Sequence, residues 1–168
     1  SGGGVLQFDG KNWIIHSTWN EHLSNDNVGN IFQDYQGNIW FSTGNGISKF
    51  SNDTWSQYYK TKSDGDGAVY AIFQDKSKNL WFGRYYGCLL RYDGNIWTEF
   101  NDFNNNHPAS TVFTAFQDSE DNIWFGTGNS GNGIYKYDGK SFTPFHLPSG
   151  GYPLANFISN IVQDKEGS

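Results

Sequence analysis

The chain has 168 residues and a formal net charge of −6, which is enough length for one domain with a real hydrophobic core. The acidic balance and the scattered Lys and Arg residues exclude a basic stripe, so nucleic acid is not expected as a partner. No apolar run reaches membrane-spanning length, no signal peptide is expected at SGGGVLQFDG, and the single Cys88 excludes an intrachain disulfide.

The first residues already indicate short strands and tight turns. Aromatic residues make up 18% of the chain and 21 glycines accompany them, a composition typical of β-structure with frequent turns. The opening stretch SGGGVLQFDGKNW aligns with SGNGIYKYDGKSF at 130–142. Both stretches lead through a DG turn to an aromatic residue, which predicts the third and fourth strands of a repeated unit.

Three segments of similar sequence follow, beginning at Val28, Val69 and Val112. Their first tryptophans lie 41 and 43 residues apart. In each repeat we expect four strands, of the types V-x-x-I-F-Q-D, N-I-W-F-G-T, G-I-x-K-Y-D and x-W-x-x-F, and no segment has helical periodicity. A regular period of this length, built from short aromatic strands, indicates the four-stranded antiparallel blades of an all-β propeller.

The repeat predicts the domain organisation. We expect one propeller domain or propeller fragment over residues 1–168, with complete blades at about 28–68, 69–111 and 112–157 and partial blades at 1–27 and 158–168. The two ends together would form a split fourth blade without its second strand, so the chain is expected to be part of a larger ring. The alternatives are a small ring closed by its own ends and a ring completed by another chain. Open blade edges would also favour self-association.

The pattern I-F-Q-D-x-x-G-N-I-W-F-G-T-x-N-G-I-x-K-Y-D-G resembles the two-component regulator propeller repeat over nearly the whole chain. The resemblance is most specific at Asp34, Gly37, Asn38, Trp40 and Thr43, and at Asp118, Asn122, Trp124, Gly126 and Thr127. The middle repeat departs from it at Lys78, where glycine is usual, and at Arg84, where threonine is usual. The family implies a periplasmic sensor propeller of hybrid histidine-kinase regulators, whose ligands are often fragments of complex carbohydrates. The immunoglobulin-like domain, membrane helix and kinase that accompany it are not in this chain.

Residues that recur in every repeat are interpreted as scaffold. Tryptophans of the second strand are expected in the core: Trp40, Trp81 and Trp124. Tryptophans of the fourth strand are expected at partly exposed outer positions: Trp13, Trp55 and Trp97. The aspartate of each QD step is expected to accept backbone hydrogen bonds in a turn, and DYQGN has too few oxygen ligands for a calcium loop.

The variable connections predict the functional face. Strand direction places the one–two and three–four turns on one face and the two–three and four–one connections on the other. The second group is long and varied, as binding loops on a rigid scaffold usually are. Its off-pattern residues are the candidates for ligand binding: Arg84, Tyr85, Tyr86, Trp19, Asn129, His107, Tyr152, Asp64 and Asp66. They offer aromatic plates and planar polar groups suited to a sugar ring. The alternative is that Trp19 fixes its loop and that Arg84 pairs with a neighbouring carboxylate.

Catalysis has little support, because no common catalytic motif occurs and no two of the four histidines have metal-ligand spacing. We expect no metal, no cofactor and no enzymatic activity. The resemblance and the loops together predict a ligand-binding sensor module, periplasmic or extracellular, for a carbohydrate fragment. Two alternatives stay open. A propeller enzyme resembling streptogramin lyase needs a His and an acidic residue converging on the central opening. A secreted lectin-like module predicts similar sites in several blades.

Overall fold

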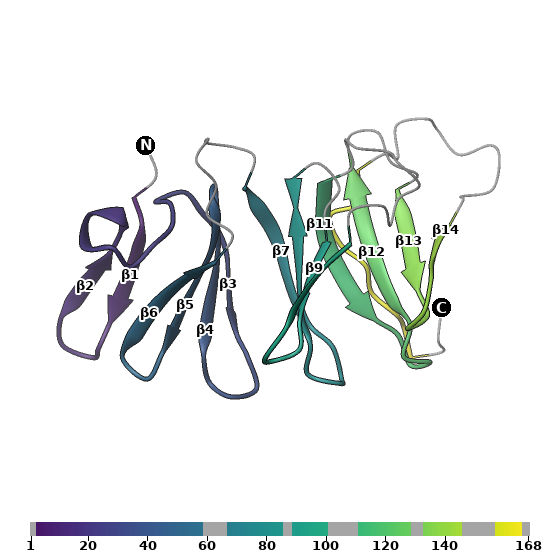
Figure 1. Ribbon diagram of the computed structural model, residues 1–168, viewed down its shortest axis with the longest axis horizontal. Helices are drawn as coiled ribbons and strands as arrows, with labels where there is room; N and C mark the ends of the chain where they lie inside the picture. The colour runs from purple at the N-terminus through teal and green to yellow at the C-terminus, as the bar shows by residue number, and fades with distance from the viewer. Residues whose placement is uncertain are drawn as a thin grey trace. The chain divides into compact units, whose positions relative to one another are not determined.

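Antiparallel strands make up nearly all of the regular structure (Figure 1). The structure, a computed structural model, describes residues 3–58, 67–85, 89–100, 111–128, 133–145 and 157–165. It divides into two compact units, unit 1 (Ser1–Val69) and unit 2 (Tyr70–Ser168). Helical structure is slight among the described residues, where η1 (Thr18–Asn20) is a single 3-10 turn, in agreement with the absence of helical periodicity in the sequence.

Unit 1 contains a two-stranded and a four-stranded sheet. In the first, β1 (Val5–Phe8) pairs with β2 (Trp13–His16). The second runs in sequence order through β3 (Val28–Gln33), β4 (Ile39–Thr43), β5 (Gly46–Ser51) and β6 (Thr54–Tyr58). Each of these strands lies where the repeat predicts one.

Two four-stranded sheets make up the regular structure of unit 2. One contains β7 (Val69–Gln74), β8 (Leu80–Arg84), β9 (Leu89–Tyr92) and β10 (Trp97–Phe100). The other contains β11 (Thr111–Gln117), β12 (Ile123–Gly128), β13 (Ile134–Tyr137) and β14 (Phe142–Phe145). All three four-stranded sheets are antiparallel meanders like propeller blades, which confirms the predicted all-β propeller fold.

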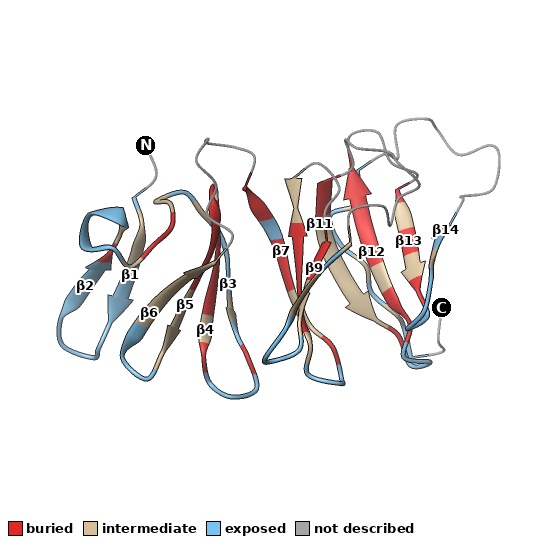
Figure 2. Cartoon of the chain, in the orientation of Figure 1, coloured by how far each residue is buried: buried red, intermediate tan, exposed pale blue. Residues whose placement is uncertain are grey.

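The core of unit 2 is aromatic and joins its two sheets. The ring of Trp81 in β8 lies 5.5 Å from that of Phe125 in β12 and 5.4 Å from that of Tyr137 in β13, and all three side chains are buried. Burying side chains of this size contributes about 2–3 kcal/mol each. Figure 2 shows the buried residues gathered in middle strands such as β12, while most of β1 and β2 is exposed.

Glycine lets the sheets of unit 2 approach each other closely. A Cβ atom added at Gly83 of β8 would lie 2.7 Å from both Cβ and the carbonyl oxygen of Val112 in β11. One added at Gly126 of β12 would lie 2.8 Å from the carbonyl oxygen of Ile158. Both distances are far shorter than van der Waals contact, so this packing explains the glycine of the N-I-W-F-G pattern.

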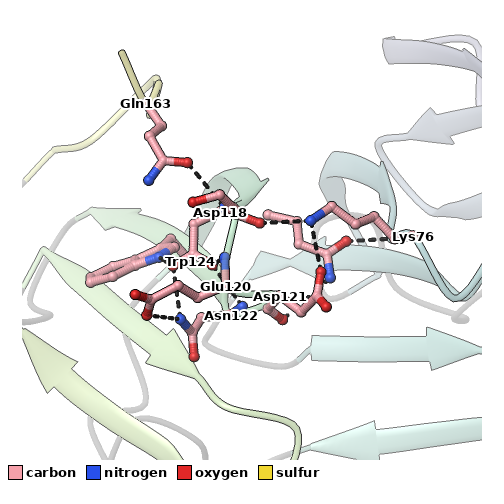
Figure 3. Close-up of polar contacts among 9 residues, drawn as sticks. Lys76, Asp118, Glu120, Asp121, Asn122, Trp124 and Gln163 are labelled. Atoms are coloured by element: carbon pink, nitrogen blue, oxygen red, sulfur yellow. Dashed lines mark hydrogen bonds and ion pairs between the residues drawn. The ribbon is translucent and has the colours of Figure 1, made fainter. Parts of the chain in front are cut away.

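One carboxylate organises the turn between the first and second strands of each blade. The Oδ1 atom of Asp118 accepts backbone hydrogen bonds from Glu120 (3.0 Å) and Asn122 (2.8 Å). Its Oδ2 atom accepts from Asn122 Nδ2 (2.9 Å) and from the indole Nε1 of Trp124 (2.7 Å) (Figure 3). The aspartates are therefore turn formers, as predicted, and they also hold the tryptophan of the second strand.

The glutamine before each aspartate links successive turns in unit 2. Gln117 Oε1 accepts a 2.7 Å hydrogen bond from the backbone N–H of Lys76, and Gln117 Nε2 donates to the carbonyl oxygen of Asp121 at 3.2 Å. Gln163 Oε1 accepts from the backbone N–H of Ser119 at 3.0 Å (Figure 3). Gln117 thus contacts both its own turn and the turn of the preceding blade, and Gln163 contacts the turn of the blade before it.

The outer tryptophans are partly exposed as expected, but two features differ from the predictions. Trp40 and Trp81 are 0% and 2% exposed, whereas Trp124 is only half-buried and lines an open cleft of about 580 Å³ with Phe145 and Val162. Residues 158–165, the described part of the partial blade expected at 158–168, do not form a strand. The backbone N–H of Ile158 donates to Thr127 O at 2.9 Å, but an extended segment without a full hydrogen-bonded ladder is not a strand.

Candidate ligand-binding site

Four aromatic side chains of unit 2 follow one another in contact, and together they are called the aromatic row: Tyr85, Tyr70, Phe113 and Phe157. The distances between successive ring centroids are 6.2, 5.5 and 4.3 Å. Tyr70 is 42% exposed and Phe157 is 56% exposed, while the other two side chains are half-buried. The row is therefore a continuous aromatic surface that solvent, and hence a ligand, can reach.

A β-bulge sets the direction of Phe113. In the β11–β12 ladder Val112 pairs with Thr127 and Thr114 pairs with Gly126, so Phe113 is the extra residue of the bulge. Bulges re-aim side chains and are common beside functional sites. The β3–β4 ladder has the same irregularity between residues 28 and 30, where the extra residue is Gly29. The same β-bulge thus occurs in two blades, but its extra residue is Gly29 in one and Phe113 in the other.

Three members of the aromatic row were missed from the sequence: Tyr70, Phe113 and Phe157. They lie in or beside a strand pattern that was assigned to scaffold as a whole. The repeats nevertheless contain a signal, because the residue after the first apolar residue of the strand is Gly29, Tyr70, Phe113 and Ser159 in successive repeats. The next position varies too, as Asn30, Ala71, Thr114 and Asn160, so the start of this strand contains positions that the scaffold does not determine.

The structure does not bring Arg84 and Tyr85 together. Arg84 ends β8, and its Nη1 atom lies 3.1 Å from Oε1 of Glu99 in β10, within the same sheet. Tyr85 instead approaches Tyr70. The strand β8 ends at Arg84, so Tyr85 lies just beyond it, and the two neighbouring side chains have different partners. Tyr85 therefore joins the aromatic row, and Arg84 pairs with a carboxylate, which was the alternative interpretation.

Trp19 is presented to solvent by a short braced turn in unit 1. Its side chain is 93% exposed. The Asp26 carboxylate accepts hydrogen bonds from the backbone N–H (2.6 Å) and the hydroxyl (3.0 Å) of Thr18, and the backbone N–H of Ser17 donates to Asn20 Oδ1 at 2.9 Å. A cleft of about 370 Å³ lined by Thr18 and Trp55, among others, lies beside this turn. The turn thus holds an aromatic plate in solvent.

The remaining predicted contacts lie outside the described residues: Asp64, Asp66, Tyr86, His107, Asn129 and Tyr152. Within the described ranges no group of three or more His, Cys, Asp or Glu side chains could hold a metal ion. A search of the same ranges for a helix long and apolar enough to cross a membrane finds none.

His16 and His22 of unit 1 are in contact, although their spacing in the sequence did not predict a pair. The Nδ1 atoms of His16 and His22 lie 2.8 Å apart, and His16 Nε2 lies 2.8 Å from Gln7 Oε1. Burial, and secondarily the charge of His22, lower the pKa of His16. In the part of the chain that the structure describes, neither imidazole is hydrogen-bonded to a carboxylate, so this pair is not the His–acid constellation that a lyase site requires.

The sequence profile of the two-component regulator propeller family matches residues 22–45, 63–83 and 106–129. Each match covers the end of a connection and much of the first two strands of a blade. No curated protein matches the chain significantly.

Several solved structures share the fold. The extracellular domain of the putative hybrid two component system BT4673 from B. thetaiotaomicron has a TM-score of 0.74 and 18% identity, covering 98% of this chain and 23% of that one. The corresponding domain of BT3049 from the same organism has a TM-score of 0.68 and 28% identity, covering 86% and 19%. Virginiamycin B lyase from Staphylococcus aureus has a TM-score of 0.58 and 24% identity, covering 73% and 42%.

The two extracellular domains from putative hybrid two component systems cover a larger share of this chain, at higher TM-scores, than the lyase does. The chain spans about a fifth of the length of those extracellular domains. Its repeated Asp–Asn–Trp turns, its four-stranded blades and the three profile matches agree with one another. Three segments of the chain therefore match the repeat of the two-component regulator propeller family.

Proposed function

We propose that the chain is part of a ligand-binding sensor module of a two-component regulatory system, located in the periplasm or outside the cell, and that residues 1–168 belong to one propeller domain or propeller fragment. The ligand that we propose is a carbohydrate fragment. The module itself carries out no catalysis. It would transmit occupancy of its site to a signalling part of the full protein.

The aromatic row is the observation that supports this proposal. Tyr85, Tyr70, Phe113 and Phe157 offer successive ring faces at separations of 4.3 to 6.2 Å. An aromatic face packs well against the apolar face of a pyranose ring, and the two tyrosine hydroxyls add hydrogen-bonding groups. Trp19 and the predicted polar residues of the long connections are proposed as further contacts.

The two competing functions have less support. A lectin-like module would present similar sites in several blades, but the shared bulge carries Gly29 in one blade and Phe113 in another. A lyase would need a histidine beside an acidic residue. The described histidines, His16 and His22, pair with each other instead. We therefore propose one asymmetric binding site.

Calorimetric titration with a panel of plant and host oligosaccharides tests the proposal. We expect one class of oligosaccharide to bind. Either Tyr70→Ala or Phe113→Gly should lower the binding affinity about tenfold, because each removes one aromatic contact. Tyr35→Ala is the matched control, because this exposed tyrosine lies in the β3–β4 turn. Silence across a broad panel would overturn the carbohydrate proposal, whereas binding that is unchanged in both variants would overturn the site.

A further inference from the structure

We propose that His16 and His22 form an acid-sensitive latch, which holds the connection between β2 and β3 in place within unit 1. The latch joins a buried imidazole at the end of β2 to an imidazole on the connection, six residues later in the chain. It does not depend on a ligand role for any residue of unit 1.

Proton positions follow from the contacts of the two rings. The side-chain oxygen of Gln7 can only accept, so the Nε2 atom of His16, 2.8 Å away, carries a hydrogen. Neutral His16 therefore has an unprotonated Nδ1, which accepts a hydrogen bond from Nδ1–H of His22 at 2.8 Å. One proton lies between the rings. If both imidazoles were cationic, two N–H groups would face each other across this distance and the contact would break.

The surroundings do not supply a compensating negative charge. The ring of His22 is stacked on Trp55 of β6, with centroids 4.9 Å apart and planes at 5°, and the ring of His16 lies 4.8 Å from the same indole. Gln7 of β1 is the polar neighbour, and it is neutral. Among the described residues, the electrostatic partner of His16 is His22. A proton added to Nδ1 of His16 would therefore place a positive charge in a half-enclosed site lined by aromatic and amide groups, which is unfavourable.

Other hydrogen bonds hold the connection as well, most closely at Ser24, whose backbone N–H donates to Ser48 Oγ at 2.9 Å and whose hydroxyl lies 2.8 Å from Thr43 Oγ1. Leu23 on the connection is buried, and its backbone N–H and that of His22 donate to Ser17 O at 3.3 and 3.2 Å. Gln57 Nε2 of β6 donates to Glu21 O at 2.8 Å. The two carboxylates of the segment have other surroundings: Asp26 accepts hydrogen bonds from Thr18, and the Glu21 side chain is exposed to solvent. Breaking the latch would therefore loosen the connection around His22 and Leu23, while Ser24 remains bound to Thr43 and Ser48.

The sign of the pH effect follows from the pKa of His16, which burial and His22 lower from its ordinary value of 6.5. The unfolded chain takes up protons near pH 6.5 before the folded chain does. The stabilisation is thus complete above that pH and is lost as the pH falls through the folded pKa. The pKa values of Asp34 and Asp118 lie below the ordinary 3.8, so the window from pH 7 to pH 5 separates the latch from these turn carboxylates.

NMR titration of the imidazoles tests this. In the wild type we expect the His16 midpoint below 6.5, with a simultaneous loss of hydrogen-exchange protection at the Leu23 amide. The unfolding equilibrium constant should rise by up to about tenfold per pH unit over this window, the limit for one differential proton. In His22→Gln the amide oxygen can accept from protonated His16, so the His16 midpoint should rise and Leu23 protection should become independent of pH.

His146→Gln is the matched control, because it removes an imidazole that is not part of the latch, and we expect it to leave the pH dependence unchanged. A wild-type His16 midpoint near 6.5, or equal pH dependence in wild type and His22→Gln, would overturn the proposal. If His22→Gln does not fold, His22→Phe keeps the stacking on Trp55 and removes the imidazole contact, so Leu23 protection should depend less on pH than in the wild type, because only burial then lowers the pKa of His16. A dependence as steep as in the wild type would contradict the latch.

Discussion

The indole Nε1 of Trp124 donates a 2.7 Å hydrogen bond to Oδ2 of Asp118, six residues earlier in the chain. The same bond joins Trp40 to Asp34 and Trp81 to Asp75, at 2.8 Å in both cases. The carboxylate that closes the turn is thus also the acceptor for the largest side chain of the adjoining strand. A buried indole N–H without an acceptor would be costly, so the D-x-x-x-N-x-W spacing ties turn geometry to core packing.

Removing this carboxylate should destabilise the blade strongly. We expect Asp34→Ala to lower the free energy of unfolding by about 3 kcal/mol, because the buried indole N–H of Trp40 and the amide of Asn38 both lose their acceptor. Urea denaturation measures this. A double-mutant cycle with Trp40→Phe should show a coupling of about 1–3 kcal/mol. Additive effects of the two substitutions would contradict the link between turn and core.

Acid should weaken the turns in a lower window than the histidine latch. Burial opposes ionisation of Asp34 and Asp118, but hydrogen bonds from the tryptophan, the asparagine and the backbone outweigh it, so the pKa of both carboxyls lies below the ordinary 3.8. Their stabilisation is complete above that value and is lost as the pH falls through the folded pKa. Thermal unfolding between pH 5 and pH 2 should show this loss, with a smaller slope in Asp34→Asn.

Adding a methyl group at Gly83 should separate the sheets of unit 2. The new Cβ would lie 2.7 Å from Val112, so we expect Gly83→Ala to cost about 1–3 kcal/mol of stability. Gly3→Ala serves as the control, because a Cβ at that position has no heavy atom within 4 Å. Equal denaturation midpoints for the two variants would show that the sheets are not packed as closely as described.

The glutamine contact should matter more than the ion pair beside it. Gln117 accepts from the backbone N–H of Lys76 and donates to the backbone of Asp121, so Gln117→Leu should cost about 1–2 kcal/mol. The Lys76–Asp121 ion pair is exposed on both sides and is expected to contribute less than about 1 kcal/mol, so Asp121→Asn should have a small effect that salt reduces further. Chemical denaturation at two salt concentrations separates the two, and the reverse order of effects would refute this ranking.

The middle repeat should be improved by restoring its glycine. Lys78 occupies the turn position of Gly37 and has φ of 72°, compared with 87° for the glycine. A left-handed backbone costs a lysine about 1–2 kcal/mol of stability. Replacing it by glycine removes this strain, but the greater conformational entropy of glycine in the unfolded chain offsets part of the gain. We expect Lys78→Gly to stabilise the protein by about 0.5–1 kcal/mol in thermal denaturation, and Gly37→Lys to destabilise it.

Several parts of the fold were predictable because comparing the repeats with one another separates recurring residues from variable ones. Strand positions, antiparallel order and the turn role of Asp34, Asp75 and Asp118 all follow from residues that recur at a fixed period. The burial of Trp124 did not follow, because burial depends on what covers a residue and not on the residue itself. The different partners of Arg84 and Tyr85 did not follow either, because β8 ends between these two residues and the sequence pattern does not fix that boundary.

The sequence by itself determined the blade, since alternating aromatic strands joined by Asp and Gly turns have one low-energy arrangement that satisfies both backbone and core. Only the tertiary structure decided which side chains meet. Tyr70, Phe113 and Phe157 come from three different segments, and their contact depends on a bulge and on how closely successive blades pack. His16 and His22 meet because a connection folds back over β2, and a loop path of this kind leaves no periodic trace in the sequence.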